Sequence, residues 1–435
     1  MPASSPAPFA LQSVAFGYPD NPGAIPLRDP VSLSFLGDQP EWNAAGRGVP
    51  AAFVRATRAT IRVVFARASG QPIPQGVWRI GARGQSGPGI AERELAVAFD
   101  SAGQTGPLEF RLDAALPDSI GKAALEWSWW ASDGNTTYTL GVTRHELLLA
   151  WKPAIAPAVW LSPKEPRDGP PDQPAANWTY LPIMQWTCEW AEGKDSPEKI
   201  CDAILAGLPE SGLRYAVGAW NVSAMLQKHG GYCGGWFRMF QAMAGAHGIM
   251  LERRFMAVDW RREPAEQARW CAIVVEAPGL NRKEPEENAS TFHDIDERLT
   301  ESSPVERHHQ RRYRFWGIPG KVLDGHCINF LRWEGRWILY DASFGIRAEL
   351  REFSLPASDP THALPVEALG DFKEAYLDLA VNFMLGSLEH EGKLFLTQHP
   401  DPQDPGFQNG VTRNGLSLDT TRIPKRDALI TFYWI

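Results

Sequence analysis

Several features that this sequence lacks narrow its class. No apolar run approaches the roughly 20 residues that a membrane-spanning helix needs, so we expect no membrane partner. The first residues, MPASSPAPFALQSVAFGYPD, lack a basic segment followed by a continuous apolar stretch, which argues against a secretory signal peptide. We therefore expect a cytoplasmic protein, with leaderless export as the alternative.

Cysteine is scarce, and its spacing excludes two common uses. The five cysteines of the 435 residues are widely separated and form no Cys-x-x-Cys pair. An odd, scattered set of this kind disfavours both a disulfide framework and a zinc ribbon, so at least one thiol should be free. We expect neither a metal nor another cofactor.

Basic residues are also fewer than acidic ones. The formal net charge is −8, which disfavours nucleic acid as the main partner. The apolar content of 44% and the charged content of 22% are typical of a folded protein, and the length predicts two or three domains.

The first half of the chain shows the alternation of β-strands. Between residues 55 and 151, runs of alternating apolar and polar residues are separated by turns such as ASDGNTT, with no helical pattern between them. This predicts an all-β sandwich of immunoglobulin-like type. Residues 1–54 should form a Pro/Gly-rich arm or a first strand, and 152–180 a proline-rich linker. The buried positions of the runs include Ala59, Ile61, Val63, Phe65, Leu108, Phe110, Leu112 and Leu125.

Three tryptophans stand close together in this region. Alternation should bury Trp127 and Trp129 on one face of a strand and turn Trp130 toward the other. The simplest interpretation is that they pack the sandwich. The alternative is an aromatic patch that binds carbohydrate or a partner protein.

Residues 181–435 mix helices and strands, which predicts an α+β domain. In DSPEKICDAILAGL, Ser196 is a candidate N-cap and Pro197 the first helical residue. Strands are expected in LERRFMAVDW, RWCAIVVEAP and DALITFYWI, and a helix over 371–390. The charged segment 281–312 is interpreted as an inserted surface loop.

The segment HGGYCGGWFRMFQAMAGAHG surrounds Cys233 with glycines. Cys233, Trp236, Phe237 and Phe240 recur at helical spacing, so the thiol should lie at a helix N-terminus, where the dipole favours thiolate. The neighbouring Gly234 and Gly235 should leave room for a substrate backbone. The alternative is a core cysteine at a glycine-rich helix start.

A base for this thiol is available in GHCINFLRWEGRWILYDASFG. Its two apolar runs flank Glu334-Gly335 and predict a hairpin. If the turn holds an even number of residues, Ile328 lies opposite Asp341, and His326 shares their face at a diagonal distance of about 7–8 Å. The alternatives are a strand histidine bonded to a carbonyl and an aspartate in a strand-end turn.

These residues resemble the core of the transglutaminase-like superfamily, which includes transglutaminases, peptide N-glycanases and bacterial cysteine proteases of papain-related fold. The resemblance covers about Trp186 to Gly345 and matches Cys233, His326 and Asp341 to the family's catalytic positions. Two features depart from the family pattern: Ala342-Ser343 follows the aspartate where Pro-Thr is usual, and the interval between cysteine and histidine is long.

The resemblance implies a catalytic triad that acts on an amide or ester carbonyl. Cys233 is the nucleophile, His326 transfers the proton, and Asp341 orients the imidazole. The oxyanion would be held by the Cys233 backbone N–H and one further donor, with Gln185, Trp186 and Trp220 as candidates.

Three functions are compatible with such a triad. The first is a hydrolase, a peptidase or amidase with a protein or peptide substrate. The second is a transglutaminase-type acyltransferase that cross-links or aminates protein glutamines. The third is a non-catalytic binding protein on the same fold.

Overall fold

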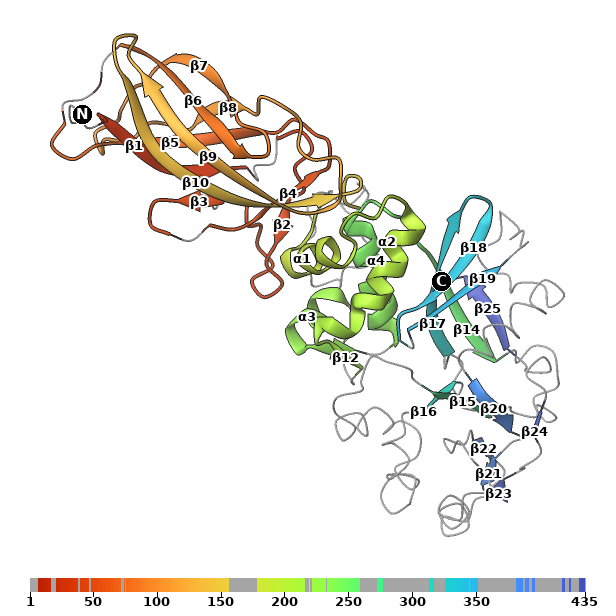
Figure 1. Cartoon of the computed structure of the whole chain (residues 1–435). Coiled ribbons are helices and arrows are strands. Elements are labelled where there is room, and N and C mark those ends of the chain that lie inside the picture. The colour runs from red at the N-terminus through yellow and green to blue at the C-terminus, as the bar shows by residue number, and fades with distance from the viewer. Residues whose placement is uncertain are drawn as a thin grey trace. The chain divides into compact units, whose positions relative to one another are not determined.

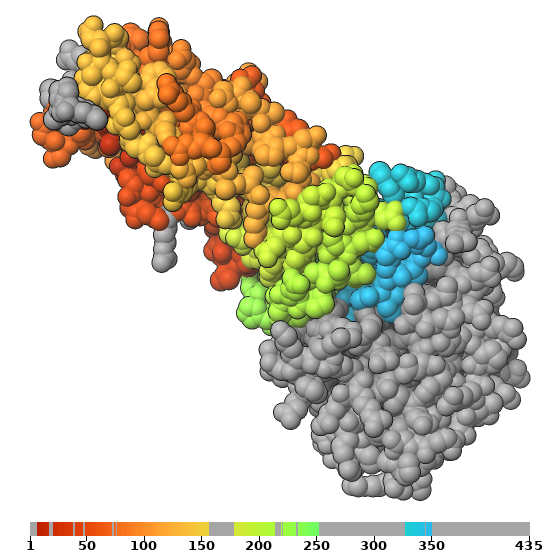
Figure 2. All heavy atoms as spheres, in the orientation of Figure 1, coloured from red at the N-terminus to blue at the C-terminus, as the bar shows by residue number. Residues whose placement is uncertain are grey.

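Figure 1 shows the computed structural model of the chain, and Figure 2 shows the same molecule as spheres, with the residues whose side chains the structure does not describe in grey. Among the described residues, no helix has both the length and the apolar character that crossing a membrane requires. The structure describes residues 7–16, 21–37, 40–46, 48–71, 74, 76–155, 178–215, 219, 221–231, 233–258, 272–276, 313–316, 325–343, 345–350, 381–385, 388–390, 393–395, 417–418, 422–423 and 430–434.

The protein is mostly β-sheet with a few helices, and its chain divides into two compact units. The first unit comprises residues 1–201 and 242–249, and the second comprises 202–241 and 250–435. The domain boundaries expected from the sequence stay predictions.

Two sheets enclose one apolar core in the first unit (Figure 1). The four-stranded sheet has the order β3-β1-β5-β8, and the five-stranded sheet has the order β4-β10-β9-β6-β7. The strands are β1 (Phe9–Ala15), β3 (Trp42–Asn43), β4 (Ala51–Val54), β5 (Thr60–Arg67), β6 (Val77–Ser86), β7 (Ile90–Ala96), β8 (Leu108–Arg111), β9 (Gly121–Ser132) and β10 (Thr137–Ala150).

Alternating side chains fill the space between these sheets. In β5, the alternating residues Ile61, Val63 and Phe65 are fully buried, as the sequence pattern predicts. In β9, Trp127 and Trp129 are 0% and 1% exposed, and their rings meet edge to face at 5.9 Å. Aromatic pairs of this geometry add to the stabilisation that area burial gives. The predicted burial of these two tryptophans is confirmed, and Trp130, half-buried, points to the other face.

Residues before position 55 are part of this architecture. β1 pairs antiparallel with β5, while β4 pairs parallel with the end of β10. The segment therefore contributes strands to both sheets. The short strands β2 (Leu27–Arg28) and β11 (Thr179–Tyr180) form a separate parallel pair.

Helix α1 (Leu181–Trp190) also belongs to the first unit and contacts β9 and β10. The Lys122 ammonium binds the Glu189 carboxylate at 2.6 Å, and the Cys188 thiol donates to the Leu149 carbonyl at 3.6 Å. These contacts attach the helix to the ends of the strands.

The second unit contains a five-stranded sheet of order β19-β18-β17-β14-β25. Its strands are β14 (Glu252–Val258), β17 (Gly325–Trp333), β18 (Arg336–Asp341), β19 (Ile346–Leu350) and β25 (Ile430–Trp434). Further strands are β12 (Arg214–Tyr215), β13 (Gly230–Gly231), β15 (Ala272–Glu276), β16 (Tyr313–Trp316), β20 (Val381–Leu385), β21 (Leu388–His390), β22 (Lys393–Phe395), β23 (Ser417–Leu418) and β24 (Arg422–Ile423).

Two helices, one starting at Pro197 and one at Cys233, begin where the sequence predicts. Helix α2 (Pro197–Gly207) is capped by Ser196, whose hydroxyl accepts from the Lys199 N–H at 3.3 Å. Helix α3 (Val222–Lys228) is capped by Asn221 in the same way. A short 3₁₀ helix, η2 (Leu208–Ser211), follows α2, and α4 (Cys233–Ala246) follows β13.

The strands predicted in LERRFMAVDW, RWCAIVVEAP and DALITFYWI are confirmed as β14, β15 and β25. The helix expected over 371–390 is wrong in its described part, because residues 381–385 form strand β20, which pairs with β15 and β24 on its two sides. Pairing with a strand on each side provides hydrogen-bond partners for the backbone N–H and C=O groups of this apolar stretch. The long-range pairing therefore decides its structure, although its apolar residues have helical spacing. Most of the 152–180 linker and the whole 281–312 insertion lie outside the described residues.

Candidate active site

Cys233 is the first residue of α4, so its predicted position at a helix start is confirmed. The first turn of α4 contains no acidic residue. The unpaired N–H groups of that turn create a positive end, and the turn itself contributes no carboxylate. The Cys233 side chain itself lies outside what the structure describes.

The glycines around Cys233 have a structural use that the sequence did not reveal. A Cβ atom at Gly235 would lie 2.6 Å from the Ala219 carbonyl oxygen and 2.7 Å from the Met225 sulfur. One at Gly231 would lie 2.6 Å from the same oxygen. The expectation that Gly235 leaves room for a substrate is therefore wrong, because its space is filled by the protein's own backbone and by α3.

The predicted hairpin of His326 and Asp341 is confirmed. Trp333 pairs with Arg336, and the two turn residues between them have φ of 49° and 75°, the positive values of a two-residue type I′ turn. The ladder runs on to Asn329 opposite Tyr340. Counting one step further puts Ile328 opposite Asp341, so by alternation His326 lies on the same face as Asp341.

Three contacts connect α4 to this sheet. The Asn329 side-chain amide donates to the Phe237 carbonyl at 3.2 Å. The Phe240 and Tyr340 rings lie 5.3 Å apart. Further along the helix, the Gln241 amide donates to the Leu251 carbonyl at 3.3 Å.

These contacts fix the direction of α4 along β17. Leu251 immediately precedes Glu252, which pairs with Phe330, so Leu251 is level with residue 331 of β17. Gln241 therefore lies level with residue 331 of β17, and Phe237 lies level with Asn329. The N-terminus of α4 accordingly points toward the beginning of β17.

The level that Cys233 reaches follows from helix and strand geometry. Four helical residues rise about 6 Å, which equals about two residues of a strand. Going back four residues from Phe237, which is level with Asn329, brings the Cys233 backbone to the level of residue 327. We infer that the first residue of α4 and His326 lie at the same end of the sheet.

The two faces of the sheet have different roles. Asn329 and Tyr340 face α4, so alternation turns His326 and Asp341 toward the opposite face. His326 is the second residue of β17 and Asp341 the last of β18, so both stand at the sheet end. A contact between Cys233 and His326 would therefore be made around the beginning of β17. The His326 side chain lies outside the described residues.

Asp341 is fully buried, and its carboxylate accepts the Ser343 backbone N–H at 3.0 Å. The preceding residue, Tyr340, donates its hydroxyl to Asp202 at 2.7 Å. The Arg347 guanidinium donates to the same Asp202 oxygen at 2.7 Å. This network ties the end of β18 to α2 and β19, which restricts movement of the Asp341 backbone.

The other cysteines that the structure describes do not begin a helix as Cys233 does. Burial raises the pKa of the Cys188 thiol to about 12, which leaves it protonated at neutral pH. Cys201 and Cys327 are buried thiols that form no disulfide, and Cys271 lies outside the described residues. His247, which directly follows the last residue of α4, is fully buried, and burial lowers its pKa to about 4.

The side-chain donor of the oxyanion hole is not assigned. Gln185 and Trp186 are half-buried in α1, where the Trp186 ring stacks on Trp190 at 6.0 Å. They belong to the first unit, whereas Cys233 belongs to the second. Trp220 lies outside the described residues.

Asn329 is the site residue that the sequence prediction missed. It is fully buried, its amide nitrogen bonds to the Phe237 carbonyl of α4, and its Oδ1 has no hydrogen-bond partner among the described residues. The available signal was an amide within the otherwise apolar run CINFL, because a buried amide in such a run needs a polar partner.

Comparison with known proteins identifies no family for this chain. No protein-family model matches the chain, and no curated protein matches it.

Proposed function

We propose that this protein is a cysteine-dependent hydrolase of amide bonds, a peptidase or amidase acting on proteins or peptides. Cys233 Sγ attacks the carbonyl carbon, and His326 gives a proton to the leaving amine as the C–N bond breaks. Water, deprotonated by His326, then attacks the thioester, so the acid leaves and the thiol is restored. Asp341 stabilises the imidazolium and holds its tautomer.

The observation that carries this proposal is the convergence of three segments at one sheet end. Helix α4 begins at Cys233 and points toward the start of β17. The hairpin register, continued by alternation beyond Asn329, puts His326 and Asp341 on one face of the sheet, the face turned away from α4. A helix N-terminus, a strand beginning and a strand end lie at this sheet end, so a contact between the nucleophile and the base would be made around the beginning of β17.

The finer fold assignment belongs to the same proposal. We propose that the two-sheet unit is an immunoglobulin-like sandwich and that the second unit has the transglutaminase-like fold. Both fit the β-rich first unit and the mixed second unit. Hydrolysis is preferred to acyl transfer because water is always present as an acceptor, whereas an amine acceptor needs a site that excludes water.

A turnover assay tests the reaction. Purified protein is incubated with a mixture of unstructured peptides and a labelled primary amine, and the release of new termini or ammonia is measured alongside amine incorporation. We expect release without incorporation, and loss of at least a hundredfold in Cys233→Ala. Cys188→Ala is the matched control, because its thiol is buried and protonated.

Two outcomes contradict the proposal in different ways. Efficient incorporation of the amine that depends on Cys233 would make the protein an acyltransferase. Absence of turnover, with no difference between the wild type and Cys233→Ala, would favour a non-catalytic binding protein.

A further inference from the structure

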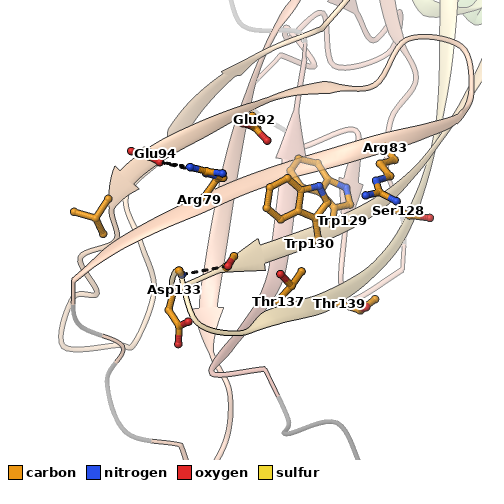
Figure 3. A pocket seen from close by; sticks show the side chains of 13 residues that line it. Arg79, Arg83, Glu92, Glu94, Ser128, Trp129, Trp130, Asp133, Thr137 and Thr139 are labelled. Atoms are coloured by element: carbon orange, nitrogen blue, oxygen red, sulfur yellow. Dashed lines mark hydrogen bonds and ion pairs between the residues drawn. The ribbon is translucent and has the colours of Figure 1, made fainter.

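A hollow lies on the outer face of the five-stranded sheet of the first unit (Figure 3). Its volume is about 830 Å³, and it extends over β6, β7, β9 and β10. The sheet face that it covers is the one turned away from the apolar core. The lining residues are Val77, Arg79, Arg83, Glu92, Glu94, Ser128, Trp129, Trp130, Ser132, Asp133, Gly134, Thr137 and Thr139.

Trp130 forms the floor of this hollow. The strand register puts it opposite Gly81 of β6 on one side and Thr139 of β10 on the other. A Cβ atom at Gly81 would lie 3.2 Å from the indole Cζ2, so the ring extends over the glycine backbone. Because glycine has no side chain, the indole can lie against the sheet with its other face toward the hollow (Figure 3).

Polar residues flank the indole along the strands. On one side, Arg79 stands opposite Ser132 in β9 and Glu94 in β7, and its guanidinium binds the Glu94 carboxylate at 2.8 Å. On the other side, Arg83 stands opposite Ser128. The aromatic floor is therefore bordered by hydrogen-bonding groups on both sides.

The charges of the lining are nearly balanced. Two guanidiniums and three carboxylates line the hollow, and one pair of them is already an ion pair. Within the described part of the chain, Arg83 and Glu92 make no ion pair, so a donor and an acceptor are both available to a ligand. A lining of mixed sign provides many hydrogen bonds but no strong field for an anion or a cation.

The place of the hollow in the sheet disfavours an extended peptide. Strands β6 and β9 are paired on both sides, so this part of the sheet has no free edge for a peptide to extend. The large apolar residues of the lining are Trp130, the exposed Val77 and Trp129, which is 1% exposed. A peptide would thus find neither backbone pairing nor a set of apolar pockets.

We propose that this hollow binds a neutral oligosaccharide, with a sugar ring stacked on the free face of Trp130. A pyranose presents a face of C–H groups to the electron-rich indole and a rim of hydroxyls to surrounding polar groups. Arg83, Glu92 and Thr139 supply such groups around the ring. This proposal is independent of the function proposed for Cys233.

The test uses the labelled full-length protein on an array of neutral oligosaccharides built from glucose, galactose, mannose and N-acetylhexosamine units. Affinity for the best-bound glycan is then measured by calorimetry. We expect Trp130→Ala to weaken binding at least tenfold and Trp130→Phe to weaken it less. Arg144→Ala is the matched control, because Arg144 pairs with Glu126 on the same sheet but does not line the hollow, and it should bind as the wild type does.

Circular dichroism of each variant shows whether the sandwich is folded. Failure of the wild type to bind any glycan of the array would overturn the proposal. So would equal binding by a folded Trp130→Ala, or binding of an unstructured peptide pool that depends on Trp130.

Discussion

Lowering the pH should destabilise the first unit through a buried histidine. His145 in β10 is 4% exposed, and its ring lies 4.4 Å from that of Trp127. Its Nδ1 has no hydrogen-bond partner within the part of the chain that the structure describes. Nε2 is hydrogen-bonded to the Thr143 hydroxyl at 2.8 Å. Burial lowers the pKa of His145 from 6.5 to about 3, so the folded protein keeps the imidazole neutral.

Proton binding determines in which direction the stability changes with pH. Below pH 6.5 the unfolded chain takes up a proton on His145 that the folded protein does not, so stability falls as the pH falls from 6.5 toward 3. At pH 5 the unfolded state gains about 2 kcal/mol, since each pH unit is worth about 1.4 kcal/mol. His247, with its pKa lowered to about 4, adds a similar amount in the same unit. We expect a total loss of about 4 kcal/mol between pH 8 and pH 5.

Hydrogen exchange followed by mass spectrometry measures this loss. The free energy of opening is determined for peptides from β9 and β10 at both pH values, after correction for the intrinsic exchange rate. His145→Gln keeps a hydrogen-bonding side chain but does not titrate, so about half of the pH dependence should disappear. Equal pH dependence in the variant and the wild type would refute the reasoning, whatever the absolute stability of the variant.

Two further substitutions test the second unit. Gly235→Ala should lower the free energy of unfolding, measured by urea denaturation, by about 1–2 kcal/mol. The overlap of the new methyl group with the Ala219 carbonyl costs about 1–3 kcal/mol, whereas the gain in helix propensity is at most about 1 kcal/mol. An increase in stability would contradict the close approach of Gly235 to Ala219. Asn329→Ala loses a hydrogen bond worth about 1 kcal/mol but also removes a buried oxygen that has no partner among the described residues, so the free energy of unfolding should change by less than about 1 kcal/mol. Turnover should nevertheless fall at least tenfold. Unchanged turnover would show that the bond from Asn329 to Phe237 does not position α4.

Local patterns predicted the elements of the candidate site well. The even turn at Glu334-Gly335, the alternation of the flanking strands and the helical spacing after Cys233 are properties of short segments, and the structure confirms each of them. The burial of Trp127 and Trp129 follows from the same alternation.

Long-range contacts account for what the sequence could not provide. The use of Gly235 depends on a carbonyl 16 residues earlier in the chain, and the role of Asn329 depends on a helix far from it in sequence. Strand β20 was mistaken for a helix because its partners, β15 and β24, are distant along the chain. Spacing alone does not contain such information.

The reactivity of Cys233 tests the central claim most directly. The protein is treated with limiting iodoacetamide at pH 6, where an ordinary thiol is almost fully protonated, and the labelled peptides are mapped. The account predicts that Cys233 is alkylated before Cys188, Cys201, Cys271 and Cys327, and that His326→Ala slows its labelling at least fivefold. Preferential labelling of another cysteine, or equal labelling of Cys233 with and without His326, would contradict a Cys233 thiolate paired with His326.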